Sequence, residues 1–164
     1  MTDIDNEAEE GTLPEGWEEK ELKEILSLKS GHAYKSKDWA EDGVPVIKIK
    51  NVRNGHVSLE GCSFIAQSLA KETSDFTIQE GDLLITLTGE IGATGIYRYP
   101  SPARVNQRVA RINVHSEKCD FDFCHFLLQS PFLRETMWGL SQGVAQANIS
   151  PKKVLGLEIS LPPL

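Results

Sequence analysis

Long apolar runs, cysteine and aromatic residues are all scarce in this chain of 164 residues. No apolar run is long enough to cross a bilayer, which argues against a membrane protein. The three cysteines are an odd number without the spacing of a disulfide framework, which favours free thiols in a reducing compartment. The opening MTDIDNEAEEGT is acidic and polar and lacks the features of a secretion signal, so a cytoplasmic location is expected.

Positive charge is also in short supply, since the formal net charge is −7. Five of the 24 acidic residues fall within residues 1–10, which hold no Lys or Arg. Residues 1–12 are therefore expected to form a disordered acidic tail. The rest of the chain keeps 19 acidic residues (24 less 5) against 17 basic ones, a balance of −2. A nearly neutral domain neither requires nor excludes a nucleic-acid partner.

Apolar periodicity indicates an α+β domain. Alternating apolar residues predict strands, the first with a basic outer face, and helical spacing predicts helices between them. The long helical stretch is expected to divide where Ser130 can cap and Pro131 can begin a second helix, and Ser150–Pro151 repeats that signal. No regular βαβ rhythm is present, so a mixed sheet flanked by helices is expected. The predicted strands are 44–51, 82–88, 95–99, 109–114 and 155–161, and the predicted helices are 20–31, 66–75 and 120–140.

The glycine-rich stretch GDLLITLTGEIGATGIY, residues 81–97, raises the possibility of a phosphate-binding loop. A Walker loop needs Lys and Ser or Thr after its last glycine, but Gly95 is followed by Ile96 and Tyr97. A dinucleotide fingerprint should open a helix, whereas a strand is expected here. The glycines are therefore interpreted as a tight strand-to-strand connection with positive φ, or as a close approach of another backbone. This interpretation argues against a further hypothesis, that the chain is a nucleotide-using enzyme.

No catalytic or metal-binding constellation is predicted. Cys119, Cys124 and His125 lack the paired C-x2-C spacing of zinc sites, so Cys62, Cys119 and Cys124 are expected to pack as small apolar residues or stay as free thiols. No serine lies in a G-x-S-x-G elbow. The LPPL at 161–164 is similar to an amino-methyltransferase motif but lacks its polar first residue.

Amide and basic side chains gather at strand ends and in loops. Arg, Asn and Gln make paired hydrogen bonds to base edges in the major groove, and Lys neutralises phosphate. Loops are also polar for no functional reason, so both interpretations stay open. The candidate DNA-binding residues are Lys48, Lys50, Asn51, Arg53, Asn54, Asn106, Gln107, Arg108, Gln142, Gln146 and Asn148.

Six stretches, taken in order, resemble the target recognition domain of the specificity subunit of type I restriction–modification enzymes. The most specific pair is GDLLITLTGEIGATGI, 81–96, followed by NQRVARI, 106–112. The others are LPEGW, 13–17, VIKIKN, 46–51, NIS, 148–150, and ISLPPL, 159–164. The match covers about residues 13–164.

This resemblance implies a single globular α+β domain at 13–164 with a curved, mixed or antiparallel sheet. It implies a non-catalytic subunit that reads double-stranded DNA, each of two such domains reading one half of a bipartite site. Methyltransferase subunits using S-adenosylmethionine, and restriction subunits using ATP and magnesium, are implied as partners. No cofactor is expected in this chain itself. The chain is expected to be the first half of a longer subunit that stops where a spacer helix begins.

The resemblance leaves some roles open. It assigns the glycine turn to the scaffold, near the NQR segment, while Asn106 and Gln107 could either bond neighbouring loops or contact DNA. A protein-interaction module, such as an acidic inhibitor that imitates DNA, is the alternative from another class. Only the acidic tail supports this alternative, and deleting residues 1–12 would separate the two hypotheses. A DNA reader should still bind DNA after the deletion, whereas a DNA mimic should lose its protein partner.

Overall fold

Most of the strands in the computed structural model, which describes residues 12–143 and 146–164, belong to two sheets. The larger sheet has the order β2 (Leu26–Ser30), β12 (Val109–Val114), β9 (Leu83–Thr86), β10 (Thr94–Ile96), β6 (Gly55–Val57) and β5 (Val52–Arg53). The smaller has the order β3 (Trp39–Ala40), β7 (Ser63–Ile65), β4 (Val44–Ile47), β11 (Ala103–Val105) and β8 (Thr77–Ile78). Each contains one parallel pair, β10 with β6 and β11 with β4, so both sheets are mixed.

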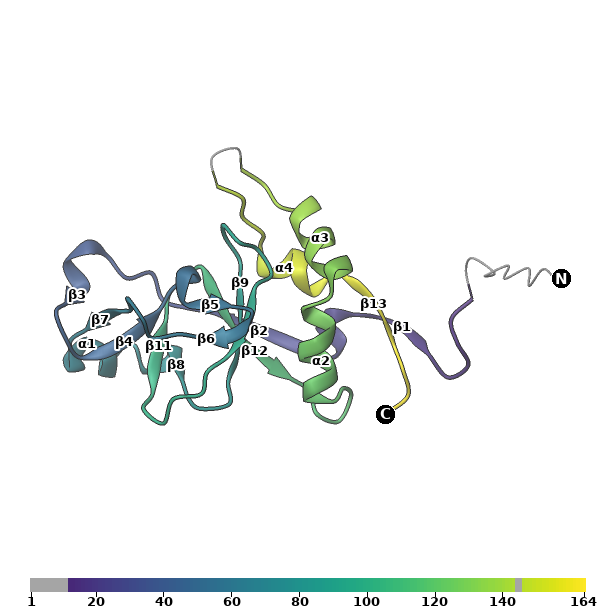
Figure 1. Ribbon diagram of the computed structural model, residues 1–164, viewed down its shortest axis with the longest axis horizontal. Coiled ribbons are helices and arrows are strands. Elements are labelled where there is room, and N and C mark those ends of the chain that lie inside the picture. Colours follow the sequence, from purple (N-terminus) through teal and green to yellow (C-terminus); the bar gives the residue numbers. More distant parts are fainter. Residues whose placement is uncertain (1–11, 144–145) are drawn as a thin grey trace, which may run out of the picture.

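The remaining elements flank these sheets. A two-stranded antiparallel ribbon joins β1 (Glu18–Glu21) to β13 (Glu158–Leu161). The helices are α1 (Gln67–Glu72), α2 (Phe121–Leu128), α3 (Pro131–Gly139) and α4 (Pro151–Leu155). In Figure 1 the smaller sheet and α1 form one end of an elongated molecule, and the ribbon lies toward the other end, beyond α2. None of the helices in the described part of the chain has the length and apolar character to span a membrane.

Polar side chains start the helices where the sequence predicts. The Asp120 carboxylate accepts the Phe123 N–H at 2.9 Å, which caps α2. The Ser130 hydroxyl accepts the Leu133 N–H at 3.3 Å, and α3 begins at the next residue, a proline. Ser150 caps α4 in the same way. Such caps satisfy backbone donors that a helix start leaves unpaired. The division of the long helical stretch at Ser130 is therefore confirmed.

Strand β9 is buried on both faces, because it lies between two cores. Leu83 and Ile85 pack with the helices in one apolar cluster, as the alternation predicts. Leu84, expected to face away from the core, is fully buried in a second cluster between the two sheets. The sequence of a central strand that is covered on both faces is typically a continuous apolar run. The α+β class is confirmed, with the strands divided over more sheets than the single one expected.

Three predicted elements are corrected. Leu155, which begins the strand predicted over 155–161, lies in α4, and β13 starts at Glu158. Residues 20–31 were expected to be helical, but a 3-10 turn at Leu22–Glu24 is followed by β2, whose residues pair with β12 from Leu26↔Val114 to Ser30↔Ala110. Pairing with a distant strand overrides the local helical spacing. The strand predicted over 44–51 ends at Ile47, and a 3-10 turn covers Ile49–Asn51.

The glycine turn after β9 has the scaffold role that the sequence indicates. Gly89 and Gly92 have φ of 70° and 76°, a region that favours glycine. At Gly95 a Cβ atom would lie 2.4 Å from the carbonyl oxygen of His56, because β10 runs directly beside β6. The two alternatives that the sequence left open both occur, positive φ at Gly89 and Gly92 and close backbone approach at Gly95.

Candidate functional site

Four polar segments meet at one edge of the larger sheet. They are residues 48–54, the glycine turn 88–92, the turn 106–108 and the part of the loop 142–148 that the structure describes; together they are called the loop cluster. The Leu87 N–H donates to the Arg108 carbonyl at 3.0 Å, and the Gly89 N–H donates to the Ala147 carbonyl at 2.9 Å. The Asn106 N–H donates to the Ile47 carbonyl at 2.9 Å. In Figure 1 the turn after β9 rises beside the strand that leads into α4.

The base of the 142–148 loop is fixed to the glycine turn. Gln142 and Asn148 exchange backbone hydrogen bonds of 2.8 and 2.9 Å. The Thr88 hydroxyl donates to Asn148 Oδ1 at 2.9 Å. The Asn148 side chain is thus used within the protein on its oxygen side, while the Gln142 side chain is exposed. These bonds fix Gln142 and Asn148 to each other and Asn148 to the glycine turn.

Arg108 and Gln146 form a side-chain pair on the outside of the loop cluster. Arg108 Nη1 donates to Gln146 Oε1 at 2.7 Å, and both residues are exposed. Gln107 beside them is exposed, and its backbone N–H donates to the His32 carbonyl at 3.0 Å. Asn106 is half-buried, and its Oδ1 accepts the backbone N–H of Arg108 at 3.4 Å. Three planar polar side chains therefore stand exposed at one place and are supplied by two separate segments.

Lys48 is directed away from this group, toward the smaller sheet. Its Nζ donates to Ser63 Oγ at 2.8 Å and lies 3.7 Å from the centroid of the Trp39 ring. Burial is the main cause that lowers the pKa of Lys48, and the charge of Lys50 adds to it. Lys50 is exposed, and its Nζ would lie 3.5 Å from a Cβ at Gly61. The two lysines form a separate basic group.

Asn51 is part of the scaffold of the turn that follows β4. The residue is 2% exposed, and its Oδ1 accepts the Lys48 N–H at 3.0 Å. Its Nδ2 donates to the carbonyls of Ser58 at 2.9 Å and Glu60 at 3.3 Å. The Asn51 amide therefore stabilises the 3-10 turn at which the predicted strand ends early. Its hydrogen-bonding groups are occupied inside the protein.

Arg53 and Asn54 lie on the β5–β6 turn, where they meet residues that the sequence patterns did not identify. Arg53 Nε is 3.8 Å from one oxygen of Glu90, and Arg134 Nη2 of α3 is 3.7 Å from the other. Asn54 has a φ of 50°, which asparagine tolerates in tight turns. The contact between Glu90 and Arg134 joins a turn to a helix distant in sequence, so no local signal marks it.

Two of the three cysteines lie inside the fold, and Cys62 is half-buried. Cys119 and Cys124 are 1% and 0% exposed and belong to the apolar cluster beneath the helices. Burial is the main cause that raises the pKa of the Cys124 thiol, to about 12. Their expected packing role is confirmed. Within residues 12–143 and 146–164 no group of three His, Cys, Asp or Glu side chains is placed to hold a metal ion.

Residues 14–164 match the family model described as the type I restriction modification DNA specificity domain. The type I restriction enzyme MjaVIII specificity subunit of Methanocaldococcus jannaschii is 32% identical over 162 residues, which cover 96% of this chain and 38% of the relative. The EcoBI specificity subunit of Escherichia coli is 26% identical, over 92% of this chain and 32% of its own length. The chain spans about a third of the length of these relatives.

The fold is also similar to a solved structure, the HsdS subunit from Thermoanaerobacter tengcongensis. The TM-score is 0.64 at 18% identity, and the match covers 94% of this chain and 35% of the HsdS chain. At this identity the similarity shows the fold alone. It agrees with the α+β class that the sequence predicts.

Proposed function

This chain belongs to the family of type I restriction–modification DNA specificity domains, and from that premise we propose that it reads one half of a bipartite DNA target. The observation that supports this function is the loop cluster, where exposed Arg and Gln side chains from separate segments stand together at one sheet edge. Such side chains make the paired hydrogen bonds that distinguish bases in the major groove.

Arg108 and Gln146 are the residues we assign first to base reading. The Arg guanidinium suits the O6 and N7 atoms of guanine, and the Gln amide suits the N6 and N7 atoms of adenine. Their mutual hydrogen bond restricts both side chains before DNA arrives, which lowers the entropy lost on binding. Gln107 and Gln142 are exposed nearby and extend the same surface.

The other candidates take different roles in this proposal. Lys48, Lys50 and Arg53 belong to segment 48–54 of the loop cluster, and we assign their cationic groups to the neutralisation of DNA phosphate. Asn51 and Asn148 support the turns through their internal hydrogen bonds. Asn54, which is exposed, and Asn106, which is half-buried, adjoin Arg53 and Arg108 in the same turns and stay candidates for DNA contact.

The proposal includes partners, because the relatives carry the name of specificity subunits. We propose that this chain has no catalytic activity and directs methyltransferase and restriction subunits to the DNA. S-adenosylmethionine, ATP and magnesium would then belong to those subunits. A cytoplasmic location follows from the same proposal, since genomic DNA is the target.

The test is the adenine-methylation map of the source genome with this gene intact and with it deleted. Deletion should remove methylation from one two-part motif and leave other motifs unchanged. Co-purification of a methyltransferase subunit with the chain checks that the system is expressed. An unchanged map in cells where that subunit co-purifies would contradict the proposed function.

Single substitutions test the assignment of residues. Arg108→Ala should cost about 1–3 kcal/mol of DNA affinity and relax specificity at one base position. Lys50→Ala should weaken binding to all sequences alike. Equal losses on every DNA for both variants would contradict base reading by Arg108.

A further inference from the structure

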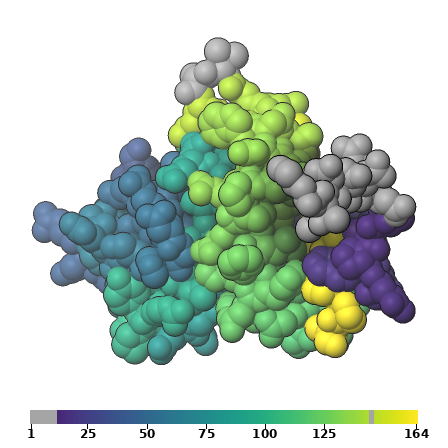
Figure 2. Space-filling model, turned by 45° about the vertical axis from the view of Figure 1, so that its right-hand side comes forward, coloured from purple at the N-terminus to yellow at the C-terminus, as the bar shows by residue number. Residues whose placement is uncertain are grey.

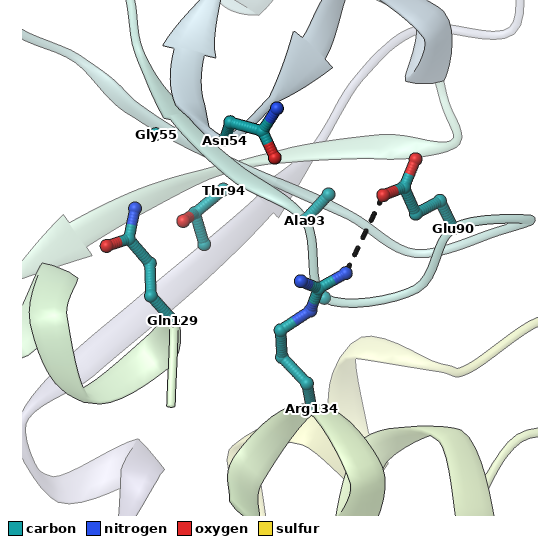
Figure 3. A pocket seen from close by; sticks show the side chains of 8 residues that line it. Asn54, Gly55, Glu90, Ala93, Thr94, Gln129 and Arg134 are labelled. Atoms are coloured by element: carbon teal, nitrogen blue, oxygen red, sulfur yellow. Dashed lines mark ion pairs between the residues drawn. The ribbon is translucent and has the colours of Figure 1, made fainter. Parts of the chain in front are cut away.

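A polar pocket of about 220 Å³ lies between two turns of the loop cluster, the β5–β6 turn and the glycine turn, and helices α2 and α3. Figure 3 shows it from close by, with side chains from the turn, the glycine turn, β10 and both helices around one space. In Figure 2 the green helices stand directly against the blue-to-teal surface of the strands. The pocket is lined by Asn54, Glu90, Gly92, Thr94, Gln129 and Arg134, among others.

The Thr94 hydroxyl is the feature of this pocket that the fold does not explain. Thr94 is 3% exposed, and its Oγ1 has no hydrogen-bond partner among the residues that the structure describes. Figure 3 shows its oxygen turned toward the side where Gln129 stands. A buried hydroxyl without a partner is unfavourable, and buried polar groups in native proteins are nearly always paired. Because this oxygen has almost no accessible surface of its own, a ligand oxygen in the pocket would supply the missing partner once the Thr94 side chain rotates toward it.

The side chains around Thr94 are rich in donors. Gln129 brings an amide, whose Nε2 is 3.1 Å from His125 Nε2, and Asn54 brings a second amide at the opposite rim. Arg134 brings a guanidinium with five N–H groups from α3. An amide, a hydroxyl and a guanidinium around one space form a donor set that suits an oxyanion.

The local charge also favours an anion. Arg53 and Arg134 flank Glu90, so two cations face one carboxylate. The distances of 3.8 and 3.7 Å are longer than a hydrogen bond, which leaves guanidinium N–H groups for another acceptor. Glu90 itself is about half exposed at the outer rim, where solvent screens its repulsion of an incoming anion.

We propose that this pocket holds a phosphate of the DNA backbone, with Arg134, Gln129 and Thr94 donating to its oxygens. The inference rests on the proposed function. Arg, Gln, Asn and Thr are side chains that contact DNA phosphates, and such contacts fix the register of a protein on the duplex without reading sequence. The pocket shares Asn54 with the β5–β6 turn and borders Glu90 of the glycine turn, so a phosphate held there positions the duplex against the loop cluster.

The sharpest test is Thr94→Val in the natural full-length chain, assembled with its methyltransferase partner. Valine keeps the shape of the side chain and removes only the hydroxyl. Because the hydroxyl has no partner in the free protein, the melting temperature should stay the same or rise. The affinity for DNA should fall roughly tenfold or more, as expected for the loss of one hydrogen bond to a charged phosphate, on target and non-target duplexes alike.

Two charge changes should act in opposite directions. Arg134→Gln should lower the affinity roughly tenfold or more and make the slope of log K against log salt shallower by ~0.9, as expected for one lost phosphate contact. Glu90→Gln should raise the affinity for all duplexes. Arg111→Gln is the matched control, since the Arg111 guanidinium lies near Asp82 and the Thr77 carbonyl, away from the pocket. Its salt slope should equal that of the wild type.

The outcomes separate the two proposals. If the wild-type complex binds no duplex, the proposed function and the phosphate pocket both fail. If it binds its target and Thr94→Val and Arg134→Gln bind equally well, only the phosphate pocket is refuted. A loss limited to one base position would make the pocket a base-reading site and overturn the inference. Protection of the chain against heat by ATP or inorganic phosphate, lost in Arg134→Gln, would assign the pocket to small phosphates instead.

Discussion

Asn51 offers a direct way to separate scaffold from DNA contact, because its amide makes three internal hydrogen bonds while the residue is only 2% exposed. Replacement by Ala leaves the Lys48 N–H and the Ser58 and Glu60 carbonyls without this partner. Each bond contributes about 0.5–1.5 kcal/mol, and the one to Glu60 is long at 3.3 Å. Because those residues are partly accessible to water, Asn51→Ala should lower the free energy of unfolding by about 2 kcal/mol.

Urea unfolding followed by tryptophan fluorescence measures this loss. A decrease of that size corresponds to a fall of about 4–8 °C in the melting temperature for a domain of this length. Asn113→Ala is the matched control, since Asn113 is exposed on β12 and should change stability by less than about 0.5 kcal/mol. If Asn51→Ala is as stable as Asn113→Ala yet binds DNA more weakly, the scaffold role is refuted and Asn51 contacts DNA.

Three further predictions concern stability and reactivity. Gly95→Ala places a Cβ 2.4 Å from the His56 carbonyl oxygen and should cost at least about 2–3 kcal/mol in a thermal melt, whereas Gly139→Ala, with open space around it, should not. Burial lowers the pKa of His125 below its usual 6.5. As the pH falls, His125 is therefore protonated in the unfolded chain before it is protonated in the folded chain, and the free energy of unfolding decreases below about pH 6.5. The urea midpoint of His125→Gln should decrease less over this pH range than that of the wild type. Burial raises the pKa of Cys124 to about 12, so a thiol reagent at neutral pH should label it only after unfolding, and rapid labelling of the native protein would contradict its burial.

The sequence predicts those elements whose local signals and tertiary surroundings agree. Strand β12 follows the predicted range from Val109 to Val114, and its alternation places Ala110 and Ile112 in the apolar cluster that the helices share. Helices α2 and α3 separate at Ser130 because the capping serine and the following proline act locally. In these places neighbouring residues decide the structure, so a pattern in the sequence is sufficient.

The errors arise where distant contacts decide. The spacing of Leu22, Ile25 and Leu26 fits a helix, but β12 offers β2 a row of backbone partners and the segment pairs with it. The second buried face of β9 depends on the smaller sheet, which supplies Ile78 and Val105 to the cluster that contains Leu84. The apolar pattern of β9 alone does not show that its second face is buried by another sheet.

The candidate site shows the same division. Composition and position marked Arg108, Gln146 and the other polar loop residues, and the fold brings several of them to one edge. Arg134, Gln129 and Thr94 carried no signal, because each occupies an ordinary position in a helix or strand. Only the packing of α2 and α3 against the glycine turn places them around one pocket.

The β1–β13 ribbon has a consequence for how such a domain is connected. Glu18 pairs with Leu161 and Glu21 with Glu158, so the incoming and outgoing chain run side by side in opposite directions. A domain whose two connections lie together can be joined to another protein as an insert, because the host needs only two neighbouring attachment points. The loop cluster belongs to other strands and turns, so its side chains are separate from this junction. The geometry of the ribbon thus keeps the attachment points of the domain apart from the side chains that we propose to contact DNA.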